Sequence, residues 1–495
     1  MSDAAPGERG DRVWPGLIAT LLLLAAARLV LTALMPLMDT TESRYGDIAH
    51  QMAVRGDWVT PWFTNESPFW GKPPLAFWLS AIGFKLFGFN EFAARAPHWL
   101  LGVLITALVG WQGRVESRRA AWHAATLLGG SALFLTLSGA VLTDMALALG
   151  NALVMIGVWR AVAAPAPAGG QRLAPVLIAL GAIIGLLAKG PVAILLCVMP
   201  LLGWGIWTRQ LGLLWQRVAW IRLALVVVAV AGPWYALAEM RTPGFLSYFL
   251  VGEHWHRFVT PGWQGDLYGT AHVRPRGMIW IFALAAALPW TLLAPLAWWR
   301  GRGQGREPLP PGSMPGRGLY LLAWALAPLV LFTMAGNILW TYVLPGLPAA
   351  ALGLASFTAR LPRPRQTDVG LSAVLAAWIV AMVLAVPAMR HYEVFERFSV
   401  AWAVSLVDKQ APAQGAPVLY VGPAMPFSLS FYTNRQARRV DSVQALPAAL
   451  RCPSSFVLLP LQEEPALQPG AGERVTRLGA SRTLALLRVD CDAAR

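Results

Sequence analysis

Two carboxylates stand close together in the segment Met38–Tyr45, which directly follows the first long apolar run of the chain. Asp39 and Glu42 are three residues apart, so they would share one face of a helix. One interpretation is helix capping, with Asp39 or a neighbouring Thr as the cap and Glu42 in the first turn. The other is catalysis, in which one carboxylate takes a proton from an acceptor hydroxyl as a general base.

A third carboxylate, Asp144, opens a later apolar run in the sequence Thr143-Asp144-Met145. It can cap that helix, or it can work with the first pair as a base or as a group that orients an acceptor or a cation. We expect Asp39 to matter most, with Glu42 and Asp144 in support. Asp39 lies at the very end of an apolar run, where a lipid-linked substrate would present its head group.

Three cations lie beside apolar segments: Lys72 in Gly-Lys-Pro-Pro, Lys189 between two apolar runs, and Arg257 in Glu-His-Trp-His-Arg-Phe. Such side chains can reach from an apolar stretch toward the membrane surface. They can also bind the phosphate of a lipid-phosphate leaving group. His254 and His256 are candidate metal ligands, with a structural or substrate contact as the alternative, and the sequence leaves a divalent metal requirement open.

Two classes of protein are disfavoured by the motifs that the chain lacks. Lys189-Gly190 has no preceding Gly-x-x-x-x-Gly, so it is not a P-loop, and no other nucleotide fingerprint occurs. A nucleotide-sugar donor or an ATP-driven pump is therefore not expected. The net charge of +15 comes largely from Arg residues in short loops between apolar runs. That placement is typical of membrane orientation and does not indicate nucleic-acid binding.

The composition indicates an integral membrane protein. Apolar residues make up 56% of the chain and charged residues only 13%, against roughly 25% in soluble domains. Many runs have the length of about 20 residues that crosses a bilayer core. We predict an all-α membrane domain with about eleven spans, near residues 14–37, 92–112, 119–137, 142–163, 173–188, 191–207, 219–239, 277–299, 318–335, 338–358 and 368–388.

The loops predict the orientation of these spans. Arg residues gather in the even-numbered loops, for example Arg114 in the second and Arg363 in the tenth. Basic loops stay in the cytoplasm, so the N terminus is expected there and the odd-numbered loops outside. Two outer loops are long, residues 38–91 and 240–276, and the first contains two predicted interfacial helices, at 43–55 and 74–88.

The C-terminal part reads as a separate soluble domain. We place the membrane domain at residues 1–389 and a small periplasmic α/β domain at 390–495. Apolar runs at 417–422, 455–460 and 482–489 predict strands, and residues 426–433 and 443–451 predict short helices. If the second and third strands pair antiparallel, Cys452 meets Cys491. An oxidising compartment would then allow a disulfide.

Several motifs together resemble a known family. PLMDTTESRYGDIAHQMAVRGDWVTPWF and FWGKPPLAFWLSAIGFKLFGFNEFAARAP carry most of the resemblance, and LTDMAL, LLAKGPVA, GPWYA and TYVLPGLPA add to it. Over about residues 14–360 the chain resembles bacterial membrane glycosyltransferases that include the lipid A aminoarabinose transferases. It resembles protein O-mannosyltransferases more distantly.

The resemblance implies a GT-C fold and a polyprenyl-phosphate sugar donor used at the outer face of the bacterial inner membrane. It implies catalytic roles for Asp39 or Glu42 and for Asp144, and a site lined by Arg44, Tyr45, Lys72, Lys189, Arg257 and Tyr342. Two departures matter. The family usually has Asp where this chain has Thr41, and often Glu where it has Gly71. The first departure leaves the identity of the base open, and the second prevents transfer of a metal-binding role.

The expected function is therefore transfer of a sugar from polyprenyl phosphate to lipid A or another cell-envelope acceptor. A protein O-glycosyltransferase is the alternative within the same class. A transporter or flippase is the alternative of another class. Transporters of that kind show internal repeats and broken helices at the membrane midplane, whereas the charged residues of this chain lie at the predicted outer ends of spans.

Overall fold

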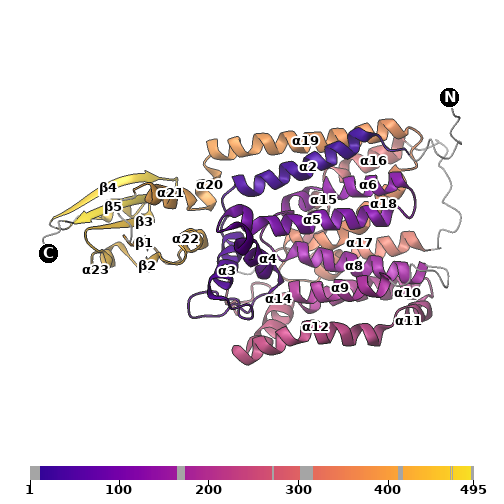
Figure 1. The fold of residues 1–495 in the computed structure, drawn as a ribbon, viewed down its shortest axis with the longest axis horizontal. Coiled ribbons are helices and arrows are strands. Elements are labelled where there is room, and N and C mark those ends of the chain that lie inside the picture. The colour runs from indigo at the N-terminus through magenta and orange to yellow at the C-terminus, as the bar shows by residue number, and fades with distance from the viewer. Residues whose placement is uncertain are drawn as a thin grey trace.

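A computed structural model of the chain describes residues 12–163, 173–269, 272–300, 316–410, 416–468, 470 and 472–491. Long helices lie side by side in a bundle, and the strands form a separate body at one end of it (Figure 1). In the part described, six helices are long and apolar enough to cross a membrane. They are α2 (Pro15–Leu34), α5 (Glu91–Gly113), α8 (Asp144–Ala163), α12 (Trp220–Arg241), the continuous pair η3 (Trp340–Gly346) and α18 (Leu347–Thr358), and α19 (Pro364–His391).

Shorter apolar helices complete the bundle. Three have 17 residues each: α9 (Leu173–Lys189), α10 (Pro191–Trp207) and α17 (Arg317–Thr333). Two predicted spans are each divided into two helices: α6 (Arg118–Gly129) with α7 (Ala132–Leu137), and α15 (Met278–Ala286) with α16 (Trp290–Arg300). A Cβ on Gly130 would meet Leu375 and Trp290 side chains at 2.8 Å. Pro289 has no N–H to continue a helical ladder. The fold class is confirmed, and a helix or a pair of helices lies at each predicted span position. Six of these positions carry helices long and apolar enough to cross a membrane, and the two divided spans are not continuous helices.

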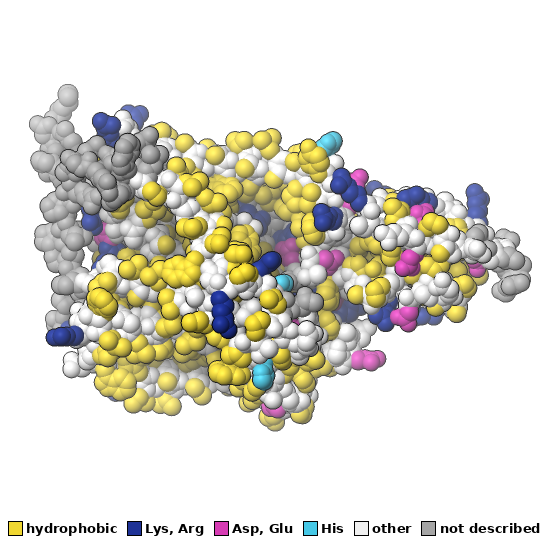
Figure 2. Space-filling view, turned by 180° about the vertical axis from the view of Figure 1, so that it is seen from behind, with side chains coloured by type: hydrophobic (Ala, Val, Ile, Leu, Met, Phe, Trp, Pro, Cys, Tyr) yellow, Lys and Arg dark blue, Asp and Glu magenta, His cyan; other side chains and the backbone are white. Residues whose placement is uncertain are grey.

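Burial separates the centre of the bundle from its rim. In α8, 94% of the apolar window is buried, against 17% in α2 and 22% in α19. Helix α8 is therefore the core helix, while α2 and α19 present apolar side chains outward. On the face shown in Figure 2, hydrophobic side chains cover most of the helical body, and charged side chains are more frequent on the strand domain. This distribution is what a bilayer requires of a spanning domain.

Residues 38–91 form a layer across one end of the bundle, here called the loop-one layer. It contains α3 (Thr41–Arg55) and α4 (Leu75–Phe87), as predicted. Ile48 and Met52 on the predicted apolar face of α3 are fully buried. They pack with aromatic residues of the same layer in one cluster. Helix α3 ends at Gly56, whose left-handed φ of 69° lets the chain reverse without a side-chain clash.

The C-terminal residues form a five-stranded sheet with the order β2-β1-β3-β5-β4. β1 pairs parallel with β2 and β3, while β5 pairs antiparallel with β3 and β4. The strands are β1 (Val418–Val421), β2 (Arg438–Val440), β3 (Ser454–Pro460), β4 (Glu473–Ala480) and β5 (Leu484–Cys491). Ser454 lies opposite Asp490, and Cys452 is disulfide-bonded to Cys491 with a Cα–Cα distance of 5.5 Å. The predicted disulfide is confirmed.

Helices in this region include both predicted ones. They are α20 (Val394–Phe398), α21 (Ala401–Lys409), α22 (Phe427–Tyr432), η5 (Val443–Ala445), α23 (Leu446–Ala449) and η6 (Glu464–Ala466). Outside this region, the described residues contain four short helices that the sequence did not predict. They are α11 (Leu211–Arg217), α13 (Phe245–Ser247), η2 (Tyr248–His256) and α14 (Arg257–Val259). Helix α19 continues to His391, so the expected domain boundary falls in its last turn.

The strand domain is fastened to the loop-one layer through α22 and the turn after it. Arg435 forms an ion pair of 2.7 Å with Asp47 of α3. The Tyr432 hydroxyl donates to Glu91 at 2.8 Å and accepts the Leu37 N–H at 2.8 Å. Phe431 is buried in the aromatic cluster of the loop-one layer. Apolar and charged contacts thus hold the two parts in one arrangement.

A candidate glycosyl-transfer site

A cavity of about 480 Å³ lies between the loop-one layer and the bundle. Residues from the start of α3, the start of α8, the end of α9, η2 and η3 line it. Every site residue predicted from the sequence except His256 lies in this lining: Asp39, Glu42, Arg44, Tyr45, Lys72, Asp144, Lys189, His254, Arg257 and Tyr342. The structure therefore brings together side chains that are more than 300 residues apart.

Asp144 and Lys189 form an ion pair in this cavity. Lys189 is the last residue of α9, and its Nζ lies 2.7 Å from Oδ1 of Asp144, the first residue of α8. The ammonium also lies 4.9 Å from the ring centre of Tyr342. Gly190, at φ 73°, turns the chain directly into α10, and a Cβ there would meet Phe249 at 2.6 Å. Within the described residues, the second oxygen of Asp144 accepts no hydrogen bond.

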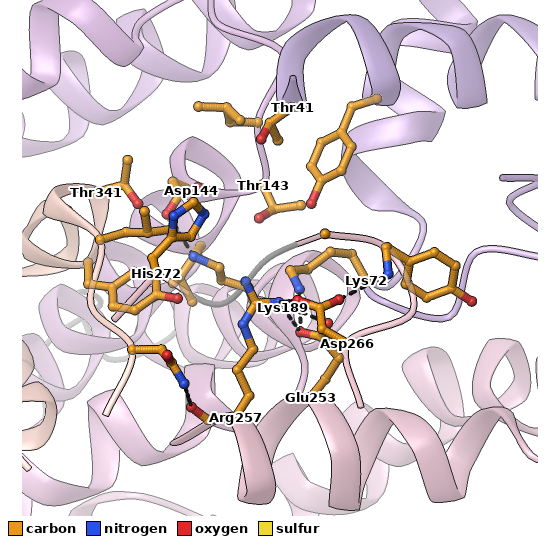
Figure 3. Close-up of a pocket in the computed structure, with 18 of the residues that line it drawn as sticks. Thr41, Lys72, Thr143, Asp144, Lys189, Glu253, Arg257, Asp266, His272 and Thr341 are labelled. Atoms are coloured by element: carbon orange, nitrogen blue, oxygen red, sulfur yellow. Dashed lines mark hydrogen bonds and ion pairs between the residues drawn. The ribbon is translucent and has the colours of Figure 1, made fainter. Parts of the chain in front are cut away.

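Glu253 joins two of the predicted cations in the same cavity. It pairs with Lys72 at 2.8 Å and with Arg257, one helical turn later, at 3.0 Å. Arg257 also lies 3.4 Å from Asp266, and Figure 3 shows these four side chains together below Thr41 and Thr143. Burial opposes the charge of Glu253, but Lys72 and Arg257 hold the pKa of its carboxyl below the usual value. Burial likewise opposes the charge of Lys72, yet Glu253 raises the pKa of that ammonium.

Both carboxylate oxygens of Glu42 accept hydrogen bonds from Arg95. The Nε and Nη2 atoms of Arg95 donate to its two oxygens at 2.7 Å and 2.6 Å, and the backbone N–H groups of Met38 and Val141 add one bond each. Burial would raise the pKa of Glu42, but Arg95 and these bonds lower it overall. Arg95 also donates to backbone carbonyls at the end of α2, among them Pro36 at 2.8 Å. The arrangement fixes the entry of the chain into the loop-one layer.

Asp39 contacts the strand domain. Its Oδ1 accepts the backbone N–H of Ser428 at 2.8 Å, and its Oδ2 accepts the hydroxyl of the same residue. Burial raises the pKa of the Asp39 carboxyl, although the bonds from Ser428 act in the opposite direction. Asp39 thus both lines the cavity and receives α22, which is a contact that no sequence pattern predicted.

The guanidinium of Arg44 lies over aromatic rings and has no carboxylate partner among the described residues. Its guanidinium carbon lies 5.4 Å from the Tyr45 ring, 5.8 Å from Phe69 and 5.5 Å from Phe427. One Nη donates to the Tyr268 carbonyl. Its Nε is buried without a hydrogen-bond partner. No described carboxylate forms an ion pair with Arg44, so its charge is available to a ligand.

Sequence reasoning missed several lining residues, including Thr41, Thr143, Glu253, Asp266, His272 and Thr341. Figure 3 shows their side chains around the same space as Asp144 and Lys189. Glu253 carried only a partial signal, because it precedes Arg257 by the four residues that separate neighbours on a helix, but the sequence did not reveal the helical segment there. Asp266 and His272 lie in an irregular segment, where spacing carries no information about neighbours.

The predicted histidines do not form a metal site with their neighbours. Both ring nitrogens of His254 contact carbonyl oxygens, of Phe249 at 2.7 Å and of Lys189 at 3.1 Å, so neither is directed at the cavity. His256 stacks on Trp263 at 5.9 Å and lies outside the lining. Across the described ranges, no three His, Cys, Asp or Glu side chains are grouped to hold a metal ion. The described residues of the cavity thus offer no ready set of ligands for a resident metal.

Comparison with known proteins gives a consistent assignment. Residues 13–249 match the family profile described as dolichyl-phosphate-mannose-protein mannosyltransferase. An undecaprenyl phosphate-alpha-4-amino-4-deoxy-L-arabinose arabinosyl transferase of Pseudomonas fluorescens is 30% identical over 403 residues, which cover 76% of this chain and 66% of that protein. The corresponding transferase of Erwinia tasmaniensis is 31% identical over 396 residues, with the same two coverages. The chain thus spans just under two thirds of the length of these relatives.

Solved structures agree on the fold. The crystal structure of ArnT from Cupriavidus metallidurans bound to undecaprenyl phosphate has a TM-score of 0.76 and 20% identity, and covers 98% of both chains. The apo form of the same protein has a TM-score of 0.72. The chain belongs to the GT-C family of membrane glycosyltransferases that includes the aminoarabinose transferases and the protein O-mannosyltransferases.

Proposed function

We propose that the chain transfers a sugar of the 4-amino-4-deoxy-L-arabinose type from undecaprenyl phosphate to lipid A or another cell-envelope acceptor. The relatives named above support the donor, since their names specify it. The observation that carries the proposal is the cavity itself. It combines one carboxylate oxygen of Asp144, which accepts no hydrogen bond from the described residues, with four cationic side chains, Arg44, Lys72, Lys189 and Arg257.

Asp144 is our proposed general base, in place of Asp39. Hydrogen bonds accepted by a carboxylate oxygen stabilise its ionised form and so weaken it as a proton acceptor. Both oxygens of Asp39 are engaged by Ser428, and both oxygens of Glu42 by Arg95. Asp144 has one oxygen bonded to Lys189 and one without a hydrogen-bond partner in the described structure. Asp39 and Glu42 then act as positioning residues for the start of α3.

The reaction follows from these roles. The acceptor hydroxyl gives its proton to Asp144, and its oxygen attacks the anomeric carbon of the donor sugar. The bond from that carbon to the phosphate oxygen breaks, and undecaprenyl phosphate leaves with the electron pair. Direct displacement inverts the anomeric configuration. Lys72, Arg257 and Arg44 stabilise the charge that develops on the leaving phosphate.

The membrane location also fits a lipid-linked donor. We propose that the cavity end of the bundle faces the periplasm, because the Arg-rich loops lie at the other end. Arg114 and Arg363, for example, flank the opposite ends of α5 and α19 from the loop-one layer. The donor phosphate would then enter at the level where α2 ends and α3 begins.

Mass spectrometry of lipid A and envelope glycans from a deletion strain tests this function. We expect loss of one amino-pentose mass from the acceptor and its return on complementation. Unchanged lipid A and glycans would contradict the proposal. A second candidate is transfer to protein, which is favoured by the match of residues 13–249 to the protein mannosyltransferase profile. It predicts loss of sugar from exported glycoproteins with unchanged lipid A.

A further inference from the structure

The acidic side chains of the cavity differ in whether they have a cationic partner, and the proposed reaction does not account for this difference. Five carboxylates belong to the lining: Asp39, Glu42, Asp144, Glu253 and Asp266. Four of them form ion pairs with a Lys or Arg, namely Glu42 with Arg95, Asp144 with Lys189, Glu253 with Lys72 and Arg257, and Asp266 with Arg257. Asp39 alone forms no ion pair with any residue that the structure describes.

The lack of a cation is significant because Asp39 is only partly exposed to solvent. Burial is the main influence on its pKa, and it acts against the ionised form. A buried carboxylate is normally paired with a cation or neutralised. The surrounding residues supply hydrogen bonds to Asp39 only through Ser428 and its neighbour Phe427. Asp39 is therefore an acid without a cationic partner, among the described residues, in the wall of the cavity.

The carboxylate of Asp39 can also accept further hydrogen bonds. An ionised carboxylate offers about four lone-pair sites, so Asp39, which lines the cavity, can accept a further hydrogen bond although each of its oxygens already accepts one from Ser428. A cation that can also donate a hydrogen bond would stabilise the ionised form of Asp39, which burial disfavours. An ammonium group meets both conditions, whereas a neutral hydroxyl meets only the second.

We infer that Asp39 binds the protonated amino group of the donor sugar and so selects amino sugars over neutral ones. The inference rests on the proposed function, which places a 4-amino-4-deoxy sugar phosphate in this cavity. Within it, Arg44, the cation of the cavity without a carboxylate partner, takes the phosphate, and Asp39 takes the amine. Each unpaired charge of the cavity then meets its opposite on the zwitterionic donor.

The other role of Asp39 is to receive the strand domain, and a matched variant separates the two. Ser428→Ala removes the hydroxyl bond to Oδ2 but leaves the charge of Asp39. Asp39→Asn removes the charge and retains one carbonyl acceptor. If Asp39 only fastens the strand domain, both variants weaken binding of all donors alike.

The test measures donor binding to the purified full-length protein. The probes are undecaprenyl phosphate carrying 4-amino-4-deoxy-L-arabinose, its neutral N-formyl derivative, and unsubstituted arabinose. We expect wild type and Ser428→Ala to bind the amino donor roughly 10- to 100-fold more tightly than either neutral donor, as a charge-assisted hydrogen bond provides. Asp39→Asn is expected to lose this preference by weakening only the amino donor.

Equal binding of amino and neutral donors by wild type would overturn the inference, and so would an unchanged preference in Asp39→Asn. The wild-type comparison needs no variant, so it holds even if Asp39→Asn fails to fold. Sugar transfer is assayed separately. A binding preference without any transfer product would contradict the proposed function and support this inference, while binding of none of the probes would contradict both.

Discussion

The ammonium of Lys189 lies 2.7 Å from Oδ1 of Asp144, where the end of α9 meets the start of α8. The pair leaves one oxygen of Asp144 unbonded within the described structure, and it keeps a cation beside the ring of Tyr342. Oriented in this way, the carboxylate can accept a proton while Lys189 stays in place to offset charge. This relationship underlies the assignment of Asp144 as the base.

Glu42 is predicted to be required for stability rather than for chemistry. Glu42→Gln leaves the buried guanidinium of Arg95 without its carboxylate, a loss of about 3–5 kcal/mol in comparable buried pairs. Thermal unfolding of the detergent-solubilised protein should therefore occur at a clearly lower temperature. Glu66→Gln, at an exposed position of the same layer, is the control and should not change the midpoint. Equal midpoints for the two variants would contradict the structural role of Glu42.

The ion pairs of Glu253 are predicted to make the stability of the folded protein fall at acidic pH. Its folded-state pKa lies below the ordinary value of 4.5 because of Lys72 and Arg257. A lowered pKa means that the ion pairs contribute stability above about pH 4.5, and that this contribution disappears as the pH falls through the folded-state pKa. The unfolding midpoint should fall more steeply below pH 4.5 in wild type than in Glu253→Gln. Parallel curves for the two proteins would rule out this contribution.

The disulfide between Cys452 and Cys491 should stabilise the strand domain. It closes a loop with a sequence separation of 39, which corresponds to roughly 3–4 kcal/mol in the chain-entropy account. Mass mapping of the native protein should find Cys197 as the one free thiol. Replacing both bridged cysteines by Ser should make the strand domain more sensitive to protease. Two further free thiols in native protein would remove the claim.

The strand domain is predicted to lie in the periplasm. The Arg-rich loops alternate with Arg-poor ones, and an odd number of spans places the two termini on opposite sides. Alkaline phosphatase fused to the C terminus should be active in cells, and a β-galactosidase fusion at the same point should be inactive. The reverse pattern would overturn the orientation and move the cavity to the cytoplasmic side.

The long-range contacts show where sequence reasoning ends. Apolar runs of about 20 residues identify helices well, because burial in lipid leaves few other structures. The cavity pairs have no such signal, since Lys72 and Glu253 are 181 residues apart, and Asp39 and Ser428 are 389 apart.

In the strand domain, too, some strands have a clear sequence pattern and others do not. β3 and β5 were predicted from apolar runs, and their antiparallel pairing led to the disulfide. β2 has only three residues, and β4 is largely polar with no buried residue, so neither has a recognisable pattern. The start of α3 was predicted as a helix, but the choice among three carboxylates depended on partners that only the folded chain reveals.

The most direct test of the account is sugar transfer by purified full-length protein with Asp144→Asn and Asp39→Asn compared at equal folded amounts. With undecaprenyl phosphate-linked amino-arabinose and lipid A as substrates, Asp144→Asn should lower kcat by about 10²- to 10⁴-fold, the usual effect of losing a general base. Asp39→Asn should act mainly on KM for the donor and leave kcat within about tenfold of wild type. Near-normal kcat in Asp144→Asn, with loss of kcat in Asp39→Asn, would contradict the account and return the base to Asp39.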